Sequence, residues 1–298
     1  MKTLRFGSRK SALALAQTHM VMDAIAKAHP DYRLELVPMV TTGDINMKPF
    51  SEATDKFGIK GLFTQELEEA LLDGRIDVAV HSLKDVPAVQ DERLPLIAYF
   101  QREDPRDALV LPEGDAKMQG KVIGCSSARR RLQLLDLFGN DEVILPVRGN
   151  VNTRLRKLDE RQFSALTLAA AGLKRLKLGS RIYRYFSTRE IIPAPGQGIL
   201  ACQGRAGGEY AEWIESIHDP LSTDCATAER TFSITLGGGC ASPVGAYAEI
   251  SGNEMRLTGF FADESRGIKL RNSITGTRED ARGLGERLAE KILKEAGV

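Results

Sequence analysis

Residues 4–40 read LRFGSRKSALALAQTHMVMDAIAKAHPDYRLELVPMV, and this stretch decides the fold class. Its apolar ends, Leu4 to Gly7 and Leu34 to Val40, predict two short strands. Between them the pattern predicts a helix from Ser11 to about Ala28, stopped by Pro30. The helix has an apolar face at three-to-four spacing, formed by Leu13, Ala16, Met20 and Ala24. Strand, helix and strand in this order predict a β-α-β unit, the building block of an α/β domain.

The chain after residue 40 continues the same alternation, with one long interruption. Thr41 to Gly61 is polar and has no periodicity, and loops of that length in a domain are usually functional lids or disordered. We then expect a helix over Thr64 to Leu72, ended by Gly74. Ile76 to Val80 and Leu94 to Phe100 predict two further strands, and the first runs directly into His81.

The chain has 298 residues and is long enough for two or three domains. Two stretches, called crossings here, are expected where it passes from one domain to the next. The first is the charged stretch Gln101 to Asp107, and the second is Pro193 to Gly198. Between them lies a second α/β set, with each strand expected to feed a helical stretch. Its strands are expected near Leu109, Val122 to Cys125, Val143 to Val147 and Ala165 to Ala169.

From about Pro220 the pattern changes to a helix, about three strands with a hairpin signal at Ser251-Gly252-Asn253, and a terminal helix from Asp280 to Ala296. We therefore expect a discontinuous α/β domain 1 (1–100 with 197–217), an α/β domain 2 (101–196) and a small α+β domain 3 (218–298).

Composition excludes several classes of protein. A net charge of +1 argues against a main partner that is nucleic acid or an anionic membrane. The four cysteines and four histidines are dispersed without a CxxC pair, which argues against a zinc site and a disulfide framework. The N-terminus has no apolar signal region and no run could span a bilayer, so we expect a cytoplasmic protein.

Basic residues follow four of the predicted strands. In α/β sheets ligands bind beyond the carboxyl ends of the strands, and helix starts there offer free N–H groups. Cations at helix starts oppose the helix dipole, so their recurrence is hard to explain as solvated surface. The four stretches are Ser8 to Ser11, Ser126 to Arg131, Arg148 to Arg154 and Gly172 to Arg175. Together they predict a site for a ligand with several carboxylates or phosphates.

Asp85 is the one carboxylate at such a strand end, next to Lys84. Among arginines it suits the stabilisation of a cation or the binding of an N–H group better than proton donation. A solvent-exposed Lys–Asp neighbour pair is the alternative. In the long loop, Lys56 and Lys60 could close over an anionic ligand, with Phe63 either stacking on a ring or packing in the core.

Three glycines precede Cys240 in the stretch LGGGCASPVG (236–245). They remove side chains that could block the sulfur, and they place it on a turn between a helix (225–233) and a strand (244–250). An accessible sulfur suits a nucleophile, whereas a buried cysteine is inert packing. We expect Cys125, Cys202 and Cys225 to be of the second kind.

Taken together, these stretches resemble the hydroxymethylbilane synthase family, also called porphobilinogen deaminases. The likeness runs in order from Arg5 to about Ala248, and the last fifty residues match only loosely. The motifs that carry it are GSRKSALA (7–14), KGLF (60–63), HSLKDVP (81–87), REDPRD (102–107), SSARR (126–130), RGNVNTR (148–154), PGQG (195–198) and GGC (238–240). One departure is Cys125, where the family often has threonine.

The resemblance implies two doubly wound domains like those of type II periplasmic binding proteins, plus a small C-terminal α+β domain. It implies a dipyrromethane cofactor joined to Cys240 by a thioether. The reaction would be the stepwise deamination and head-to-tail polymerisation of four porphobilinogen units on that primer, with hydrolytic release of hydroxymethylbilane for tetrapyrrole (haem) synthesis. We expect such a transferase to be monomeric.

The resemblance also assigns site residues. Asp85 matches the catalytic aspartate. The residues matching cofactor contacts, besides Cys240 and Asp85, are Ser11, Lys84, Ser127, Arg129, Arg130, Arg148, Asn150 and Gln197. The residues matching substrate contacts are Arg9, Ser11, Arg148, Arg154, Arg175, Lys56, Lys60 and Phe63.

Two other classes remain open from the residues alone. A non-catalytic anion receptor with the same hinge would use the basic junctions but would leave Cys240 and the third domain without a role. RNA binding through Arg129, Arg130 and Arg131 fits poorly with the near-neutral charge and the lack of an aromatic platform.

Overall fold

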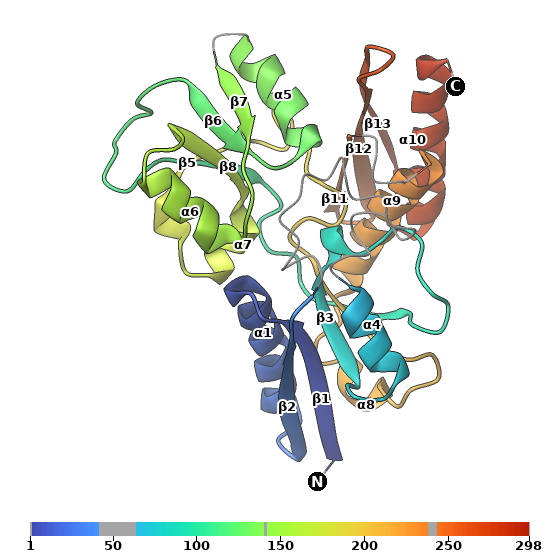
Figure 1. The fold of residues 1–298 in the computed structure, drawn as a ribbon. Coiled ribbons are helices and arrows are strands. Elements are labelled where there is room, and N and C mark those ends of the chain that lie inside the picture. Colours follow the sequence, from blue (N-terminus) through green and yellow to red (C-terminus); the bar gives the residue numbers. More distant parts are fainter. Residues whose placement is uncertain (1, 42–63, 140–141, 238–242, 298) are drawn as a thin grey trace. The chain divides into compact units, whose positions relative to one another are not determined.

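The computed structural model describes residues 2–41, 64–139, 142–237 and 243–297 (Figure 1). Lys56, Lys60, Phe63 and Cys240 lie outside these ranges, and so does the expected loop after Thr41. The described chain forms two compact units, each made of two chain segments. Unit 1 is Met1–Arg102 with Ile199–Asp224, and unit 2 is Glu103–Gly198 with Cys225–Val298.

Unit 1 is built on a five-stranded sheet with the order β2-β1-β3-β10-β4. Its strands are β1 (Lys2–Arg9), β2 (Tyr32–Met39), β3 (Val78–Ser82), β4 (Leu96–Tyr99) and β10 (Leu200–Gln203). β1 is parallel to β2 and β3, as the β-α-β prediction requires, whereas β10 is antiparallel to β3 and β4. β10 was not predicted from the sequence, and it returns from far along the chain to lie between β3 and β4.

Helices cover both faces of this sheet (Figure 1). They are α1 (Ala12–Ala28), α4 (Gln65–Leu72) and α8 (Ala211–Ile214). Phe6 of β1 packs in one core with α1 and α8, where its ring contacts Trp213 edge-on. The next residue, Gly7, faces α4, and a Cβ there would come within 2.3 Å of Ile76. This alternation along the strand is what a sheet buried on both faces requires.

The buried face of α1 differs from the predicted one. Leu13, Ala16, Met20 and Ala24 are only half-buried, and the fully buried residues are Gln17, Thr18, Val21 and Ile25. Gln17 exchanges hydrogen bonds with Ser82 at 2.9 and 3.0 Å, and Thr18 Oγ1 donates to the carbonyl of Ala14 at 3.0 Å. Because these polar side chains have hydrogen-bond partners, they can be buried. The prediction used only the apolar residues and therefore selected the adjacent face of the helix.

Unit 2 contains a second five-stranded sheet, with the order β7-β6-β8-β5-β9. Its strands are β5 (Asp107–Val110), β6 (Val122–Cys125), β7 (Val143–Pro146), β8 (Ala165–Ala169) and β9 (Ile182–Tyr185). α5 (Ala128–Phe138) packs on one face, and α6 (Val151–Asp159) and α7 (Ala170–Arg175) pack on the other. The α/β class and the two helix-covered sheets are therefore confirmed.

One expectation for this sheet was wrong. β6, β7 and β8 each lead into a helix, but β5 does not, since residues 111–121 contain no helix. β5 runs antiparallel to β8, whereas β6 runs parallel to β8. The chain therefore leaves β5 at the end of the sheet where β6 begins, and no crossover helix is needed.

The rest of unit 2 contains an antiparallel sheet, β11 (Val244–Ser251), β12 (Glu254–Asp263) and β13 (Ile268–Thr277). This sheet packs against helix α10 (Ala281–Ala296) and against the part of helix α9 (Pro220–Thr235) that begins at Cys225. The expected hairpin joins β11 to β12 through Gly252 and Asn253, with Gly252 at φ +61°. Three one-turn 3₁₀ helices complete the described elements: η2 (Leu83–Asp85), η4 (Gly179–Arg181) and η5 (Arg278–Asp280). None of the helices in the described ranges is long and apolar enough to cross a membrane.

Candidate active site

Asp85 lies in the short helix η2, which directly follows β3 in unit 1. Two apolar neighbours anchor this turn, since Leu83 and Val86 are each only 1% exposed. The backbone N–H of Leu83 also donates to the carbonyl of Ile199, at 3.0 Å, just before β10. Lys84 and Asp85 lie between the anchors and are half-buried. The turn thus fixes the backbone of the catalytic candidate while leaving its carboxylate accessible.

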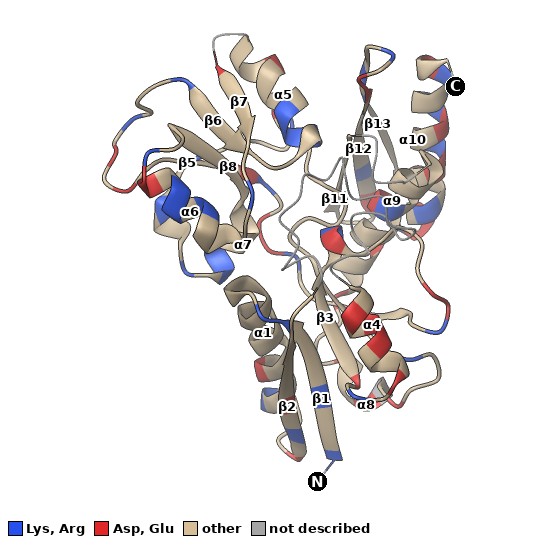
Figure 2. Cartoon of the chain, viewed as in Figure 1, with Lys and Arg blue, Asp and Glu red and all other residues tan. Residues whose placement is uncertain are grey.

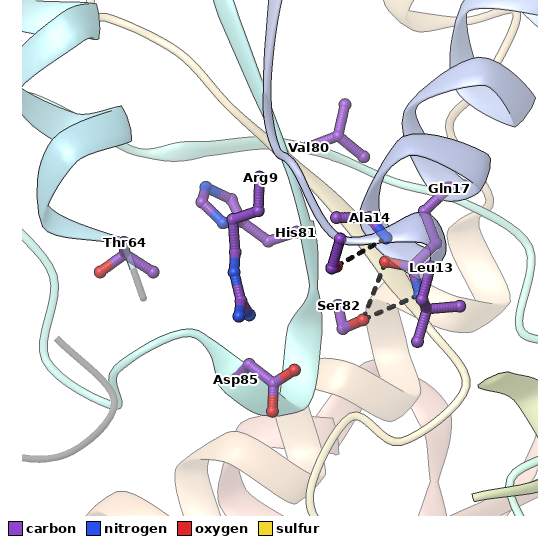
Figure 3. Close-up of a pocket in the computed structure, with 10 residues that line it drawn as sticks. Arg9, Leu13, Ala14, Gln17, Thr64, Val80, His81, Ser82 and Asp85 are labelled. Carbon is purple, nitrogen blue, oxygen red and sulfur yellow. Dashed lines mark hydrogen bonds between the residues drawn. The ribbon is translucent and has the colours of Figure 1, made fainter. Parts of the chain in front are cut away.

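A cavity of about 60 Å³ opens beside Asp85 (Figure 3). The residues that line it come from β1, α1 and its N-cap, β3, η2 and the position before α4, and they include Arg9, Ser11, His81 and Asp85. Figure 3 shows the side chain of Arg9 extending toward Asp85. Ser11 is the N-cap of α1, and its hydroxyl accepts from the N–H of Ala14 at 3.3 Å. In unit 1 the structure therefore brings three predicted site residues, Arg9, Ser11 and Asp85, to one cavity.

His81 also lines this cavity, although the sequence analysis gave it no role. Its ring is buried, and Nε2 lies 3.0 Å from the side-chain oxygen of Gln203 on β10. Burial lowers the pKa of His81 to about 4, against smaller opposing contributions from Gln203 and Asp85. The ring is therefore neutral at physiological pH.

This buried ring predicts a pH-dependent stability. The pKa of His81 is lower in the folded chain than the 6.5 of a free histidine, so the unfolded chain binds more protons between these values. Stability is then greatest above pH 6.5 and falls by roughly 3 kcal/mol as the pH drops to about 4. In His81→Gln this part of the pH dependence should be missing, which chemical denaturation at pH 7.5, 6, 5 and 4 measures. Equal slopes in both proteins would contradict the prediction.

In unit 2, three strand ends lead into helices, as predicted. Ser127 caps α5 by accepting from the N–H of Arg130 at 3.5 Å, and Asn150 caps α6 by accepting from the N–H of Thr153 at 2.9 Å. α7 follows β8 without a side-chain cap. Figure 2 shows the basic residues on α5 and α6.

Arg129 and Arg130, at the start of α5, are buried against Asp107 of β5. Their guanidinium groups are 2.9 and 2.8 Å from the two carboxylate oxygens, and Asp107 is fully buried. Gln197 donates to the same carboxylate at 2.9 Å and to the carbonyl of Pro105 at 2.7 Å. Burial of Asp107 favours a raised pKa, but the two arginines outweigh it and hold the pKa of Asp107 well below its usual range. The structure therefore gathers three predicted site residues around one acid.

Asp107 was not predicted as a site residue, because in the sequence it lies in the charged stretch Gln101 to Asp107. The available signal was an acid at the first position of the apolar strand 107–110, because a carboxylate there needs a cationic partner. Asp107 also explains why arginines are tolerated at a helix start, where the helix dipole disfavours cations.

The other predicted arginines of unit 2 lie beside backbone carbonyls. Arg154 donates to the carbonyl of Gly149 at 2.6 Å and to the hydroxyl of Ser126 at 2.8 Å. Arg175 donates to the carbonyl of Gly198 at 2.6 Å, but within the described ranges its buried Nε has no hydrogen-bond partner. Burial lowers the pKa of Arg175 to about 10 and also lowers the pKa of Arg148. Such desolvated cations are stabilised when an anionic ligand binds.

Cys125, Cys202 and Cys225 are buried, which confirms the expectation that they serve as packing. Burial raises the pKa of the Cys202 thiol to about 12 and raises that of Cys125 as well, so neither forms a reactive thiolate. Their inertness leaves Cys240 as the remaining candidate nucleophile among the cysteines of the sequence.

Two family models match the chain and together cover most of it. The first, described as "Porphobilinogen deaminase, dipyromethane cofactor binding domain", matches residues 4–212. The second, "Porphobilinogen deaminase, C-terminal domain", matches residues 223–294.

Curated relatives carry the same name. A porphobilinogen deaminase of Ruminiclostridium cellulolyticum is 48% identical over 292 residues, covering 98% of each chain. One from Nostoc sp. is 43% identical over 304 residues, covering 100% of this chain and 93% of the relative.

Solved structures with a related arrangement include ligand-binding domains. The BenM effector-binding domain with benzoate has a TM-score of 0.42 at 15% identity, covering 80% of this chain and 94% of that one. The periplasmic aliphatic sulphonate binding protein SsuA from Escherichia coli has a TM-score of 0.40 at 14% identity, covering 80% and 71%. At these scores the likeness supports no conclusion about function.

Proposed function

Because the chain belongs to the porphobilinogen deaminase family and has its dipyrromethane cofactor-binding domain, it is a transferase, and we propose that it joins four porphobilinogen units head to tail and releases hydroxymethylbilane by hydrolysis. The observation that carries this proposal is the cavity shared by Arg9, Ser11 and Asp85. It combines a cation for a substrate acid group with a carboxylate for the reacting pyrrole. The family assignment leaves no reason to retain a non-catalytic receptor as the main alternative.

The residues of unit 2 fit a dipyrromethane, which carries several acid side chains. The buried, unpartnered Nε of Arg175 is a donor that lacks an acceptor among the described residues, and a carboxylate is the acceptor that suits it. The residues proposed to hold the cofactor are Ser11, Lys84, Asp85, Ser127, Arg129, Arg130, Arg148, Asn150 and Gln197, with a thioether to Cys240. When bound, the cofactor supplies the primer pyrrole to which units are added.

Substrate binding is assigned to a second, overlapping set of residues. Each porphobilinogen brings an acetate and a propionate, so a growing chain needs many spaced cations rather than one pocket. The proposed contacts are Arg9, Ser11, Arg148, Arg154, Arg175, Lys56, Lys60 and Phe63.

Asp85 is the proposed catalytic residue. When the carbon–nitrogen bond of porphobilinogen breaks, ammonia leaves with the electron pair and the pyrrole becomes a cation. The carboxylate of Asp85 stabilises that cation and accepts the hydrogen bond of the pyrrole N–H. A fixed charge of this kind lowers the barrier because it needs no reorganisation during the reaction.

The proposal extends to organisation and setting. It assigns residues 1–100 with 197–217, 101–196 and 218–298 to three domains, of which the last carries Cys240. It further describes a monomeric enzyme that acts in the cytoplasm, in porphyrin and haem biosynthesis.

The test combines intact mass with ammonia release. The purified chain should exceed its polypeptide mass by two pyrrole units and should release ammonia from porphobilinogen. In Cys240→Ser both the excess mass and the activity should be lost, whereas Cys202→Ser, at a buried position, should retain the excess mass. An active wild-type protein of unmodified mass would refute the covalent primer.

A further inference from the structure

Residues 191–197 of unit 2 form a segment that is mostly buried although it contains no helix or strand. Ile191, Ile192 and Gln197 are each at most 1% exposed. Loops usually lie at the surface, because buried backbone N–H and C=O groups need hydrogen-bond partners. The partners of this segment come from two separate parts of unit 2. One is helix α5, and the other is the sheet of β11, β12 and β13, here called the C-terminal sheet, with its helix α9.

Gln133 on α5 supplies the partners on one side. Its side-chain oxygen accepts from the N–H of Ile192 at 2.9 Å, and its side-chain nitrogen donates to the carbonyl of the same residue at 3.2 Å. The nitrogen also donates to the carbonyl of Arg129 at 3.2 Å. Gln133 is fully buried. An amide suits this position because it donates and accepts, whereas a carboxylate could only accept and an ammonium could only donate.

The C-terminal sheet and α9 supply the partners on the other side. β11 is an edge strand of that sheet, and the N–H of Ala246 donates to the carbonyl of Pro193 at 2.9 Å. Glu229 on α9 accepts from the N–H of Ala248 and from the N–H of Gly196, each at 2.7 Å. The segment therefore covers the edge that β11 would otherwise leave open.

Apolar packing surrounds these hydrogen bonds. Phe260 and Ala262 of β12, which are 0% and 1% exposed, pack with Leu132 of α5 and with Ile192. Gly245 of β11 leaves room for the segment, since a Cβ there would lie 2.9 Å from the carbonyl oxygen of Ile192. Contacts as close as these hold both sides in one arrangement, as in a protein core.

Ion pairs also join α5 to the C-terminal sheet, but they are exposed. Arg131 pairs with Glu264, and Asp136 pairs with Lys269 and Arg271. The side chains of these pairs are between 35% and 48% exposed, and ion pairs of that exposure contribute little to stability. The buried hydrogen bonds and the apolar packing are therefore the contacts that fix the arrangement.

The two ends of the proposed cofactor site lie on the two sides of this contact. The residues proposed to bind the acid groups of the cofactor include Ser127, Arg129 and Arg130, at the start of α5. The thioether is assigned to Cys240, which the sequence places between α9 and β11. A ligand held at both ends is oriented for reaction only if the elements at the two ends keep a fixed separation.

We propose that Gln133 is a positioning residue of the reaction. By binding both backbone polar groups of Ile192, it fixes α9 and β11 relative to the start of α5, so that the thioether and the acid groups of the cofactor are held at one separation. This inference rests on the proposed function. Gln133 acts through the 191–197 segment and does not itself contact cofactor or substrate.

The first test measures the contact itself and needs no activity. In the wild-type holoenzyme, hydrogen exchange at the amide of Ala246 should be as slow as at the amide of Leu257 in the middle of β12, because its acceptor belongs to a buried segment. In Gln133→Met, a side chain of similar size that cannot replace the amide, exchange at Ala246 should become at least about tenfold faster with Leu257 unchanged. A wild-type Ala246 amide that exchanges like an exposed one would overturn the proposal, even if the variant failed to fold.

The second test separates positioning from stability. Ile292→Ala is the matched control, since Ile292 of α10 is fully buried on the helix-covered face of the C-terminal sheet and its loss lowers stability away from the 191–197 segment. Rates are divided by the fraction of chains that carry the mass of the cofactor. Per loaded chain, kcat of Gln133→Met should fall at least about tenfold while KM changes by less than about twofold, because the proposed substrate contacts lie outside the C-terminal sheet.

The control decides between the two roles. Ile292→Ala should keep the wild-type kcat per loaded chain even where its Tm is as low as that of Gln133→Met. If kcat falls equally in both variants, or in neither, Gln133 serves only the fold and the inference fails. A wild-type holoenzyme that releases no ammonia from porphobilinogen would instead refute the proposed function, and slow exchange at Ala246 in the same protein would tell that failure apart from a failure of the contact.

Discussion

In Asp85→Asn, the turnover of porphobilinogen is expected to fall by about 10²–10³-fold, the usual effect of removing one preorganised charge from a reacting centre. The amide keeps the size of the side chain, and its oxygen can still accept a hydrogen bond. It cannot stabilise the cation that remains when ammonia leaves. Since the loss is confined to the reacting state, kcat should fall far more than KM rises.

Structural damage is a poor explanation for such a loss. Asp85 is half-buried on a turn anchored by Leu83 and Val86, so the turn does not depend on its charge. Steady-state ammonia release and the denaturation midpoint should be measured together. Asp23→Asn, at an exposed position of α1, is the matched control and should leave both unchanged. Near-normal turnover in Asp85→Asn would remove this residue from the mechanism.

The second large effect concerns Asp107. Asp107→Asn leaves the buried guanidinium groups of Arg129 and Arg130 without a counter-charge, and breaking a buried pair in this way costs about 3–5 kcal/mol. For a chain of 298 residues that corresponds to a fall in Tm of roughly 5–8 °C. Thermal unfolding of the purified variant measures it directly.

A surface pair provides the comparison. Glu160 and Arg156 of the same unit are 3.9 Å apart, with side chains 52% and 71% exposed. Glu160→Gln should therefore change stability by no more than about 0.5 kcal/mol. If the two variants were equally stable, the cluster around Asp107 would not hold the start of α5 as described.

The pH dependence of the Asp107 effect has a definite sign. The pKa of Asp107 is depressed in the folded state, so its contribution is fully present above the ordinary aspartate pKa near 4 and is lost as the pH falls further. Wild type and Asp107→Asn should consequently converge in stability only in strong acid. Convergence already at pH 5 would contradict the assignment.

Local patterns predicted much of the fold. β6 and β8 occupy the residues expected for them, Val122–Cys125 and Ala165–Ala169, and α10 ends at Ala296 as its apolar periodicity indicates. β9 and β10 were not foreseen, because they pair antiparallel with strands far away in the sequence, and such pairing leaves no local signal.

In the site, too, the features set by local sequence were predictable and those set by long-range pairing were not. Ser127 and Asn150 were identifiable as helix starts because capping is local. The pairing of Asp107 with Arg130, 23 residues apart, and of His81 with Gln203, 122 residues apart, depends on strand order, which one sequence does not reveal. The polar residue Gln17 was wrongly left out of the core for a similar reason, since its partner Ser82 lies 65 residues away.

The late return of β10 to the middle of its sheet has a consequence for biosynthesis. Because β10 lies between β3 and β4, the first sheet cannot be completed until residues 200–203 have left the ribosome. All the strands of the second sheet, by contrast, lie between residues 107 and 185. During translation the second sheet can thus assemble first, and the N-terminal strands wait with open edges that favour aggregation. Since Gln203 belongs to that last strand, the buried His81 gains its hydrogen-bond partner only when about two thirds of the polypeptide has left the ribosome.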